Sequence, residues 1–96
     1  MADFIFLHHD DAGEHESEDW GPYLDRLREI GVFQGGSAIG KGECFRKAGA
    51  PPEPTAHIHG FIRVQADSLA EAERLLPGHP TYEAGGTVEI RELPRG

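Results

Sequence analysis

The chain has 96 residues, of which 38% are hydrophobic and 27% charged, and its formal charge at pH 7 is −8. This length allows one small domain, residues 1–96, and the negative charge argues against nucleic acid or an anionic membrane as a partner. No apolar run approaches the roughly 18 residues that cross a bilayer, the start lacks a signal-peptide pattern, and the single Cys44 favours a cytoplasmic location.

Two elements are predicted before residue 31. Residues 4–7 form a short apolar run that is typical of a buried central strand. The acidic segment 10–19 follows, and we interpret it as a solvated loop. A helical stripe comes next, made of Trp20, Leu24, Leu27 and Ile30. Ser17 or Asp19 can cap this helix, and Gly31 is expected to end it.

The middle of the chain predicts two strands and a long connection. Residues 33–40 are a glycine-rich strand, in which Gly35 and Gly36 indicate a bulge or the close approach of another backbone. The proline-rich segment 48–54 cannot pair along a ladder and is expected to be a loose connection. Residues 57–65 alternate in period two, which predicts the third strand.

A second helix and a last strand complete the pattern. Ser68 and Glu71 form a capping box at the start of the helix, and Pro77 is expected to end it. The buried stripe of the helix consists of Leu69, Ala72, Leu75 and Leu76. Residues 87–91 alternate again and predict the last strand, with His79 in the turn that precedes it.

The element order predicts a ferredoxin-like α+β fold. Strand, helix, strand, strand, helix and strand, joined by right-handed crossovers, give a four-stranded antiparallel sheet with two helices on one face. In the third strand Ile58, Ile62 and Val64 are expected to face the helices. The first strand can turn either Phe4, Phe6 and His8 or Ile5, Leu7 and His9 to the open face, and the pattern does not choose between them.

The face of the sheet opposite the helices is the predicted site. Strict alternation places His57, His59, Phe61 and Arg63 on it, together with Thr87, Glu89 and Arg91 from the last strand. Such a face is usually covered, and twofold pairing with a second copy is the commonest assembly. We therefore expect a homodimer through this face, with a small-molecule pocket in any gap that remains.

Several segments resemble the YCII-related (DGPF-type) family. They are His-Gly-Phe at 59–61, Asp-Ser-Leu-Ala-Glu-Ala at 67–72, His-Pro at 79–80 and Gly-Thr-Val-Glu-Ile-Arg at 86–91. The resemblance implies a ferredoxin-like fold that forms a dimeric α+β barrel. It also implies chemistry on small organic acids, since a related branch includes a dehydrochlorinase of a chlorinated hydroxyquinol and muconolactone isomerase shares the fold.

The chain departs from this family at three places. The Asp-Gly-Pro-Phe signature is absent from its expected region at 47–54. His79 stands where many members have an aspartate before the proline that follows helix two. The helix-one histidine of some members is missing, with Trp20 and Tyr23 in its neighbourhood. The histidine–aspartate pair proposed for some members therefore does not carry over intact.

Histidines are the candidate catalytic residues. A neutral imidazole titrates in the useful range, so His79 or His59 is a candidate general base, although His79 can instead cap carbonyls of the preceding helix. His57 and His59 lie two apart on a strand and could chelate a metal, with a third ligand from His8 or from a partner copy, but cross-strand packing is favoured. We predict no metal and no cofactor.

The remaining candidates would bind a substrate. Arg63 and Arg91 can each hold a carboxylate with paired donors, or can pair with Glu89 across the sheet. Tyr23 is a candidate for the rim of the cleft. The full set of predicted substrate-binding residues is His8, His57, Phe61, Arg63, Arg91 and Tyr23.

These residues support two hypotheses for the function. The first is acid–base chemistry of an isomerase, lyase or hydrolase type on a small aromatic or lactone-like organic acid. The alternative is a dimer that binds or senses a small molecule without converting it. A further interpretation is a purely structural dimer, in which the histidines fill the interface and leave no pocket.

Overall fold

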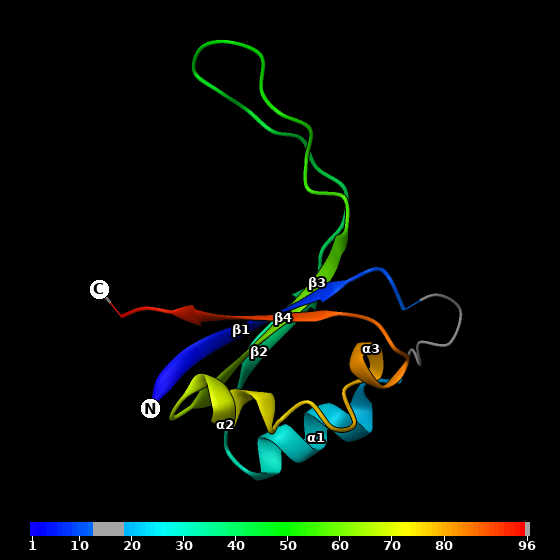
Figure 1. The fold of residues 1–96 in the computed structure, drawn as a ribbon, viewed down its shortest axis with the longest axis vertical. Helices are drawn as coiled ribbons and strands as arrows, with labels where there is room; N and C mark the ends of the chain where they lie inside the picture. The colour runs from blue at the N-terminus through cyan, green and yellow to red at the C-terminus, as the bar shows by residue number, and fades with distance from the viewer. Residues whose placement is uncertain (13–18, 96) are drawn as a thin grey trace.

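A computed structural model of the protein describes residues 1–12 and 19–95. Its elements are β1 (Ala2–His9), α1 (Gly21–Glu29), β2 (Phe33–Ala38), β3 (Ile58–Ala66), α2 (Leu69–Glu73), α3 (Pro80–Glu83) and β4 (Val88–Leu93). The strands form one antiparallel sheet in the order β2-β3-β1-β4. All three helices lie on one face of it (Figure 1), which confirms the predicted ferredoxin-like α+β arrangement.

The first helix begins and ends close to the predicted residues. Trp20 occupies the N-cap position, one residue later than predicted for Asp19, whose carboxylate still accepts a hydrogen bond from Gly21 N–H at 3.1 Å. Gly31 has a φ of 78° and ends the helix as expected. Ser17, the other predicted cap, and the middle of the acidic segment lie outside the described residues.

The second helical region differs from the prediction. Ser68 Oγ accepts a hydrogen bond from Glu71 N–H at 3.2 Å, as the capping motif predicts, but α2 ends at Glu73, well before Pro77. A further short helix, α3, then replaces the expected turn. Pro80 stands at its first position, where the fixed φ of proline suits a helix start, and His79 caps it.

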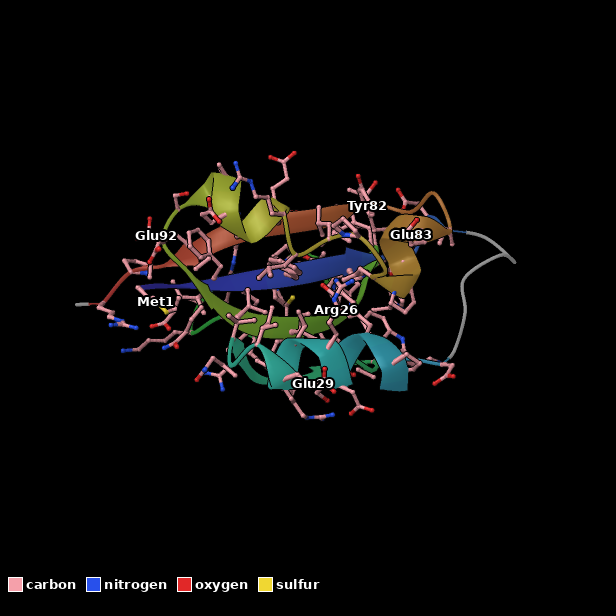
Figure 2. All side chains as sticks on the ribbon, turned by 90° about the horizontal axis from the view of Figure 1, so that it is seen from below. Met1, Arg26, Glu29, Tyr82, Glu83 and Glu92 are labelled. Atoms are coloured by element: carbon pink, nitrogen blue, oxygen red, sulfur yellow. The ribbon has the colours of Figure 1, made fainter. Side chains whose placement is uncertain are left out.

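The register between β1 and β3 decides which side chains enter the core. Phe4 stands opposite Val64 and Phe6 opposite Ile62, and all four side chains are buried beneath the helices. Since β1 alternates, Ile5 and Leu7 lie on the open face. Figure 2 views the helix layer from below, with α1 along one flank of the sheet and α2 and α3 along the other.

Two bulges interrupt the ladders of β3. The register between β2 and β3 shifts between Phe33 and Gly36, which confirms the bulge predicted there. A second shift lies between His8, which pairs with Gly60, and His9, which pairs with Ile58. His59 is therefore an extra residue with no partner in β1.

The second bulge corrects the predicted open face. His59 lies beside His8, with ring centroids 6.1 Å apart, and so belongs to the helix side of the sheet rather than to the face of Phe61 and Arg63. Ile58, predicted to face the helices, stands opposite His9 and is not part of the core cluster. Strict alternation fails because the extra residue, His59, reverses the parity of the strand residue before it, Ile58.

The open face keeps an apolar centre with charged residues around it. Ile5, Leu7 and Phe61 are half-buried there, and Arg63 stands opposite Ile5. No helix of the described residues lies over this face, as Figure 1 shows. Among the described helices there is also none with the length and apolar character that a membrane span requires.

The bulge in β2 leads to the first test. A Cβ at Gly36 would collide with Phe61 O, so we expect Gly36→Ala to lower the free energy of unfolding by roughly 1–3 kcal/mol. Urea unfolding measures the change. Gly42→Ala is the matched control, since a Cβ there meets nothing within 4 Å and stability should hold. Equal stability of both variants would contradict the close approach of β2 and β3.

Candidate functional site

The end of β1 carries a histidine into the space between the sheet and the helices. His8 is only 4% exposed. Its ring stacks on Trp20, the N-cap residue of α1, with centroids 4.8 Å apart and an interplanar angle of 23°. Its Nε2 has no hydrogen-bond partner among the described residues. His8 is thus a buried imidazole that is held by ring contacts and whose Nε2 makes no hydrogen bond with the described residues.

A second histidine packs edge-on against the first. His79 is fully buried, and its ring centroid lies 4.6 Å from that of His8 and 4.8 Å from that of Trp20. Its Nδ1 accepts a hydrogen bond from Tyr82 N–H at 3.4 Å. A neutral ring in this role carries its proton on Nε2. His79 therefore fixes the start of α3 and forms one wall around His8.

The bulge in β3 adds the third histidine. His59 reaches the helix side because it has no partner in β1. Gly60 makes room for the arrangement, since a Cβ there would stand 3.2 Å from His8 Nδ1 and 3.3 Å from Ser37 O. A side chain at residue 60 would press on the imidazole, so glycine allows His8 to lie across β3.

A cavity of about 410 Å³ opens beside these rings. His8 and His59 form one wall, and Trp20, Leu24 and Phe33 provide apolar surface. The bulged backbone of β2 closes another side. Aromatic walls with a few polar groups are typical of sites that hold small organic molecules.

Burial keeps two of the histidines neutral. Loss of water lowers the pKa of His8 from 6.5 to about 3, helped by the neighbouring imidazoles of His79 and His59. Burial likewise lowers the pKa of His79 to about 4, which its backbone hydrogen bond partly offsets. At neutral pH both rings are uncharged, so they can accept or donate a hydrogen bond without introducing a buried charge.

One cation stands in the cavity wall. Arg28, in the last turn of α1, lines the cavity, and its Cζ lies 5.0 Å from the centroid of the Phe33 ring. Its Nη1 donates a hydrogen bond to Asp25 Oδ1 at 3.1 Å. It was not among the predicted site residues. A signal was present, because Trp20, Leu24 and Arg28 are spaced by four and follow one ridge of a helix.

The structure brings together only part of the predicted set. His8, His59 and Phe61 line the cavity, Phe61 with its side chain turned to the open face by its pairing with Leu7. His79 does not line the cavity but packs against His8, which does. Trp20, interpreted from sequence as packing, both packs and lines the cavity.

The other predicted residues lie elsewhere. Tyr23 belongs to the core and donates a hydrogen bond to Leu75 O at 2.7 Å, and burial raises the pKa of its hydroxyl. Arg63 donates to Gln34 O at 2.8 Å, and Arg91 lies 3.4 Å from Glu89, its neighbour in β4. His57 is exposed, and its ring centroid lies 4.9 Å from that of His9. None of these four lines the cavity.

A metal is the other ligand that clustered histidines suggest. In residues 1–12 and 19–95 there is no group of three His, Cys, Asp or Glu side chains placed to hold an ion. The bulge separates the expected chelating pair, because His57 stays near His9 while His59 turns to His8. The predicted chelating pair of His57 and His59 is therefore not formed in the described residues.

The neutral histidines predict a pH dependence of stability. In the unfolded chain a histidine titrates near pH 6.5, whereas His8 and His79 in the folded chain titrate at about 3 and 4. Between these values the unfolded state binds more protons, so stability should fall as the pH is lowered. We expect a loss of about 2 kcal/mol per histidine between pH 7 and pH 5, measured by urea unfolding.

Two variants separate this effect from general acid sensitivity. His8→Phe should remove about half of the pH dependence, because one of the two buried imidazoles is gone. His57→Gln, at an exposed position, should leave it unchanged. An identical pH dependence in the wild type and in His8→Phe would show that His8 is not held neutral.

Comparison with known proteins agrees with this architecture. The profile of the YCII-related domain family matches residues 4–95, whereas no curated protein matches the sequence. A similar solved structure is 5-chloro-2-hydroxyhydroquinone dehydrochlorinase (TftG) from Burkholderia phenoliruptrix in complex with 2,5-dihydroxybenzoquinone. It shares 15% identity, with a TM-score of 0.56, over 98% of this chain and 95% of that one, and so supports the fold alone. The chain belongs to the YCII-related domain family, whose profile spans nearly its whole length.

Proposed function

We propose that this protein binds a small planar organic acid, aromatic or lactone-like, in the cavity between α1 and the sheet and performs acid–base chemistry on it. The observation that carries the proposal is the pairing of His8 and His59 in the wall of an aromatic-lined cavity of about 410 Å³. That volume is within the usual range for small-molecule sites. The similar dehydrochlorinase binds 2,5-dihydroxybenzoquinone, which is a small planar ring like the ligand that we propose here.

We assign the proton transfer to His59. It reaches the cavity from the strand bulge, and an imidazole suits proton transfer near neutral pH. His8 supplies a neutral hydrogen-bonding group beside it. His79, predicted from sequence as a catalytic residue, becomes a positioning residue, because it is fully buried and holds His8 from behind.

We assign recognition of the acid group to Arg28. The sequence pointed to Arg63 and Arg91, but both lie outside the cavity wall. Arg28 reaches the cavity from α1, and a guanidinium binds a carboxylate or a phenolate through charge-assisted hydrogen bonds. The chemistry proposed here requires no cofactor, since an imidazole moves the proton.

One observation favours the alternative of a binding protein without catalysis. A pKa of about 3 makes His8 a weak base in the empty cavity. A bound anion would raise this pKa, because a negative charge nearby stabilises the imidazolium. The fate of a bound ligand, converted or only retained, distinguishes the two functions.

The proposal includes a homodimer through the open sheet face. Ile5, Leu7 and Phe61 form its apolar centre, and a chain of 96 residues gains stability from such pairing. The charged side chains of Arg63 and Glu89 surround that centre. We place the dimer in the cytoplasm, where the free Cys44 stays reduced.

Ligand binding can be followed through the single tryptophan. Trp20 lines the cavity, so 2,5-dihydroxybenzoquinone as a probe should quench its fluorescence in a saturable way, after correction with free tryptophan amide. We expect Arg28→Ala to weaken binding by roughly tenfold or more, because a charge-assisted contact is lost. Arg74→Ala, an exposed arginine of the α2 end, is the control and should bind as the wild type does. Equal binding by both variants would exclude Arg28 from the site.

Catalysis is tested with hydroxylated quinols and small lactones as a substrate panel, analysed by mass spectrometry. We expect the wild type to convert at least one compound and His59→Ala to be slower by roughly 100-fold or more. His57→Ala controls for the loss of an exposed histidine two residues away and should keep full turnover. Full turnover by His59→Ala would remove His59 as the base, and retention of a compound without conversion would favour the binding protein.

A further inference from the structure

Among the described residues, the connection between β2 and β3 is the longest exposed segment. It comprises residues 39–57, and we call it the arm. Figure 1 shows it leaving the sheet on the side opposite the three helices, along the longest dimension of the molecule, 46 Å. One sheet with one helix layer is about 20 Å thick. The arm therefore overhangs the open sheet face by roughly 25 Å, which exceeds the spacing of about 10 Å between two packed sheets.

The arm makes few hydrogen bonds with the other described residues of its own chain. At its base Ile39 N–H donates to His59 O at 2.9 Å, and His57 O accepts from Asp10 N–H at 2.8 Å. Between these points, residues 40–56 have no hydrogen bond or ion pair with any described residue. Three prolines at 51, 52 and 54 stiffen it. Residues 40–56 are exposed except for the half-buried Cys44, so most of the surface of the arm is available to another molecule.

The tip of the arm has the composition of a contact surface. Phe45 is 85% exposed, the highest value among the exposed large hydrophobic side chains of the described residues. Lys41, Arg46 and Lys47 lie within four residues of it along the chain, with one acidic residue, Glu43, among them. Aromatic and arginine side chains are enriched where proteins bind one another.

The charge of the arm is opposite to that of the rest of the chain. Residues 39–57 hold three of the nine basic residues and two of the seventeen acidic ones, which leaves six basic and fifteen acidic residues for the remainder. A basic tip is therefore attracted to the acidic body of a second copy, whereas two acidic bodies repel each other. The complementarity favours the chain itself as the partner over a nucleic acid, which the net charge of −8 repels.

We propose that the arm clasps a second copy of this chain, with Phe45 packed on the partner and the basic tip against its acidic surface. The inference rests on the proposed homodimer and adds to it. When two open faces meet, each arm extends past the partner's sheet along its flank. The arms then supply contact area outside the sheet faces and oppose the mutual repulsion of the two bodies.

The single cysteine allows a direct test. Cys44 is free and lies next to Phe45, so a photoactivated crosslinker attached to it reports what the tip touches. In a mixture of unlabelled and nitrogen-15-labelled chains, we expect crosslinked peptides that join a light and a heavy chain. Crosslinks confined to single chains in a protein that sedimentation shows to be dimeric would overturn the clasp and leave the dimer standing. A monomeric wild type would overturn both.

Variants test the energetic contribution. We expect Phe45→Ser to raise the dimer dissociation constant at least tenfold in sedimentation equilibrium, and Lys41→Glu with Lys47→Glu to raise it further at low salt. Leu69→Ser is the control, because it also removes apolar surface, at a residue of the helix layer that is 57% exposed. We expect it to change the dimer dissociation constant less than twofold. Both sites are exposed, so folding is retained. A wild-type dissociation constant for Phe45→Ser would overturn the proposal.

Discussion

The candidate site depends on one extra residue in β3. His8 pairs with Gly60 and His9 with Ile58, so His59 has no place in the ladder and turns to the helix side. Gly60 lets the imidazole of His8 lie across the strand at this point. Without the bulge, period-two alternation would send His59 to the open face and leave His8 with His79 as its one histidine neighbour among the described residues. The chemistry that we propose therefore follows from a local irregularity of the backbone.

The same layer serves both stability and the site. The rings of Trp20, Tyr23, Phe6 and His8 surround His79, which also caps α3. Burial of two imidazoles holds them neutral and makes folding sensitive to acid. One side of this cluster is core and the other is cavity wall, so Trp20 and His8 contribute to packing and to ligand contact together. The opposite face of the sheet and the arm are left for association.

Hydrophobic periodicity, capping residues and glycines in the sequence predicted most of the fold. The alternation at 57–65, the capping motif at Ser68 and the glycine pair at 35–36 each led to the observed element. The sequence did not reveal that His59 changes face, because one bulge overrides the alternation of a whole strand end. Gly60 was the available signal, as a glycine inside a strand often marks a bulge. Arg28 was not predicted because its spacing with Trp20 and Leu24 is equally typical of a helix face that only packs. The helix α3 was not predicted because histidine is an uncommon cap.

The position of the His59 side chain is the most direct test of this account, and nuclear Overhauser effects between ring protons measure it in solution. We predict contacts between the ring of His59 and the ring of His8, which lie together in the cavity wall. Contacts between His59 and the side chains of Leu7 or Phe61, on the open face, would contradict the bulge and with it the site.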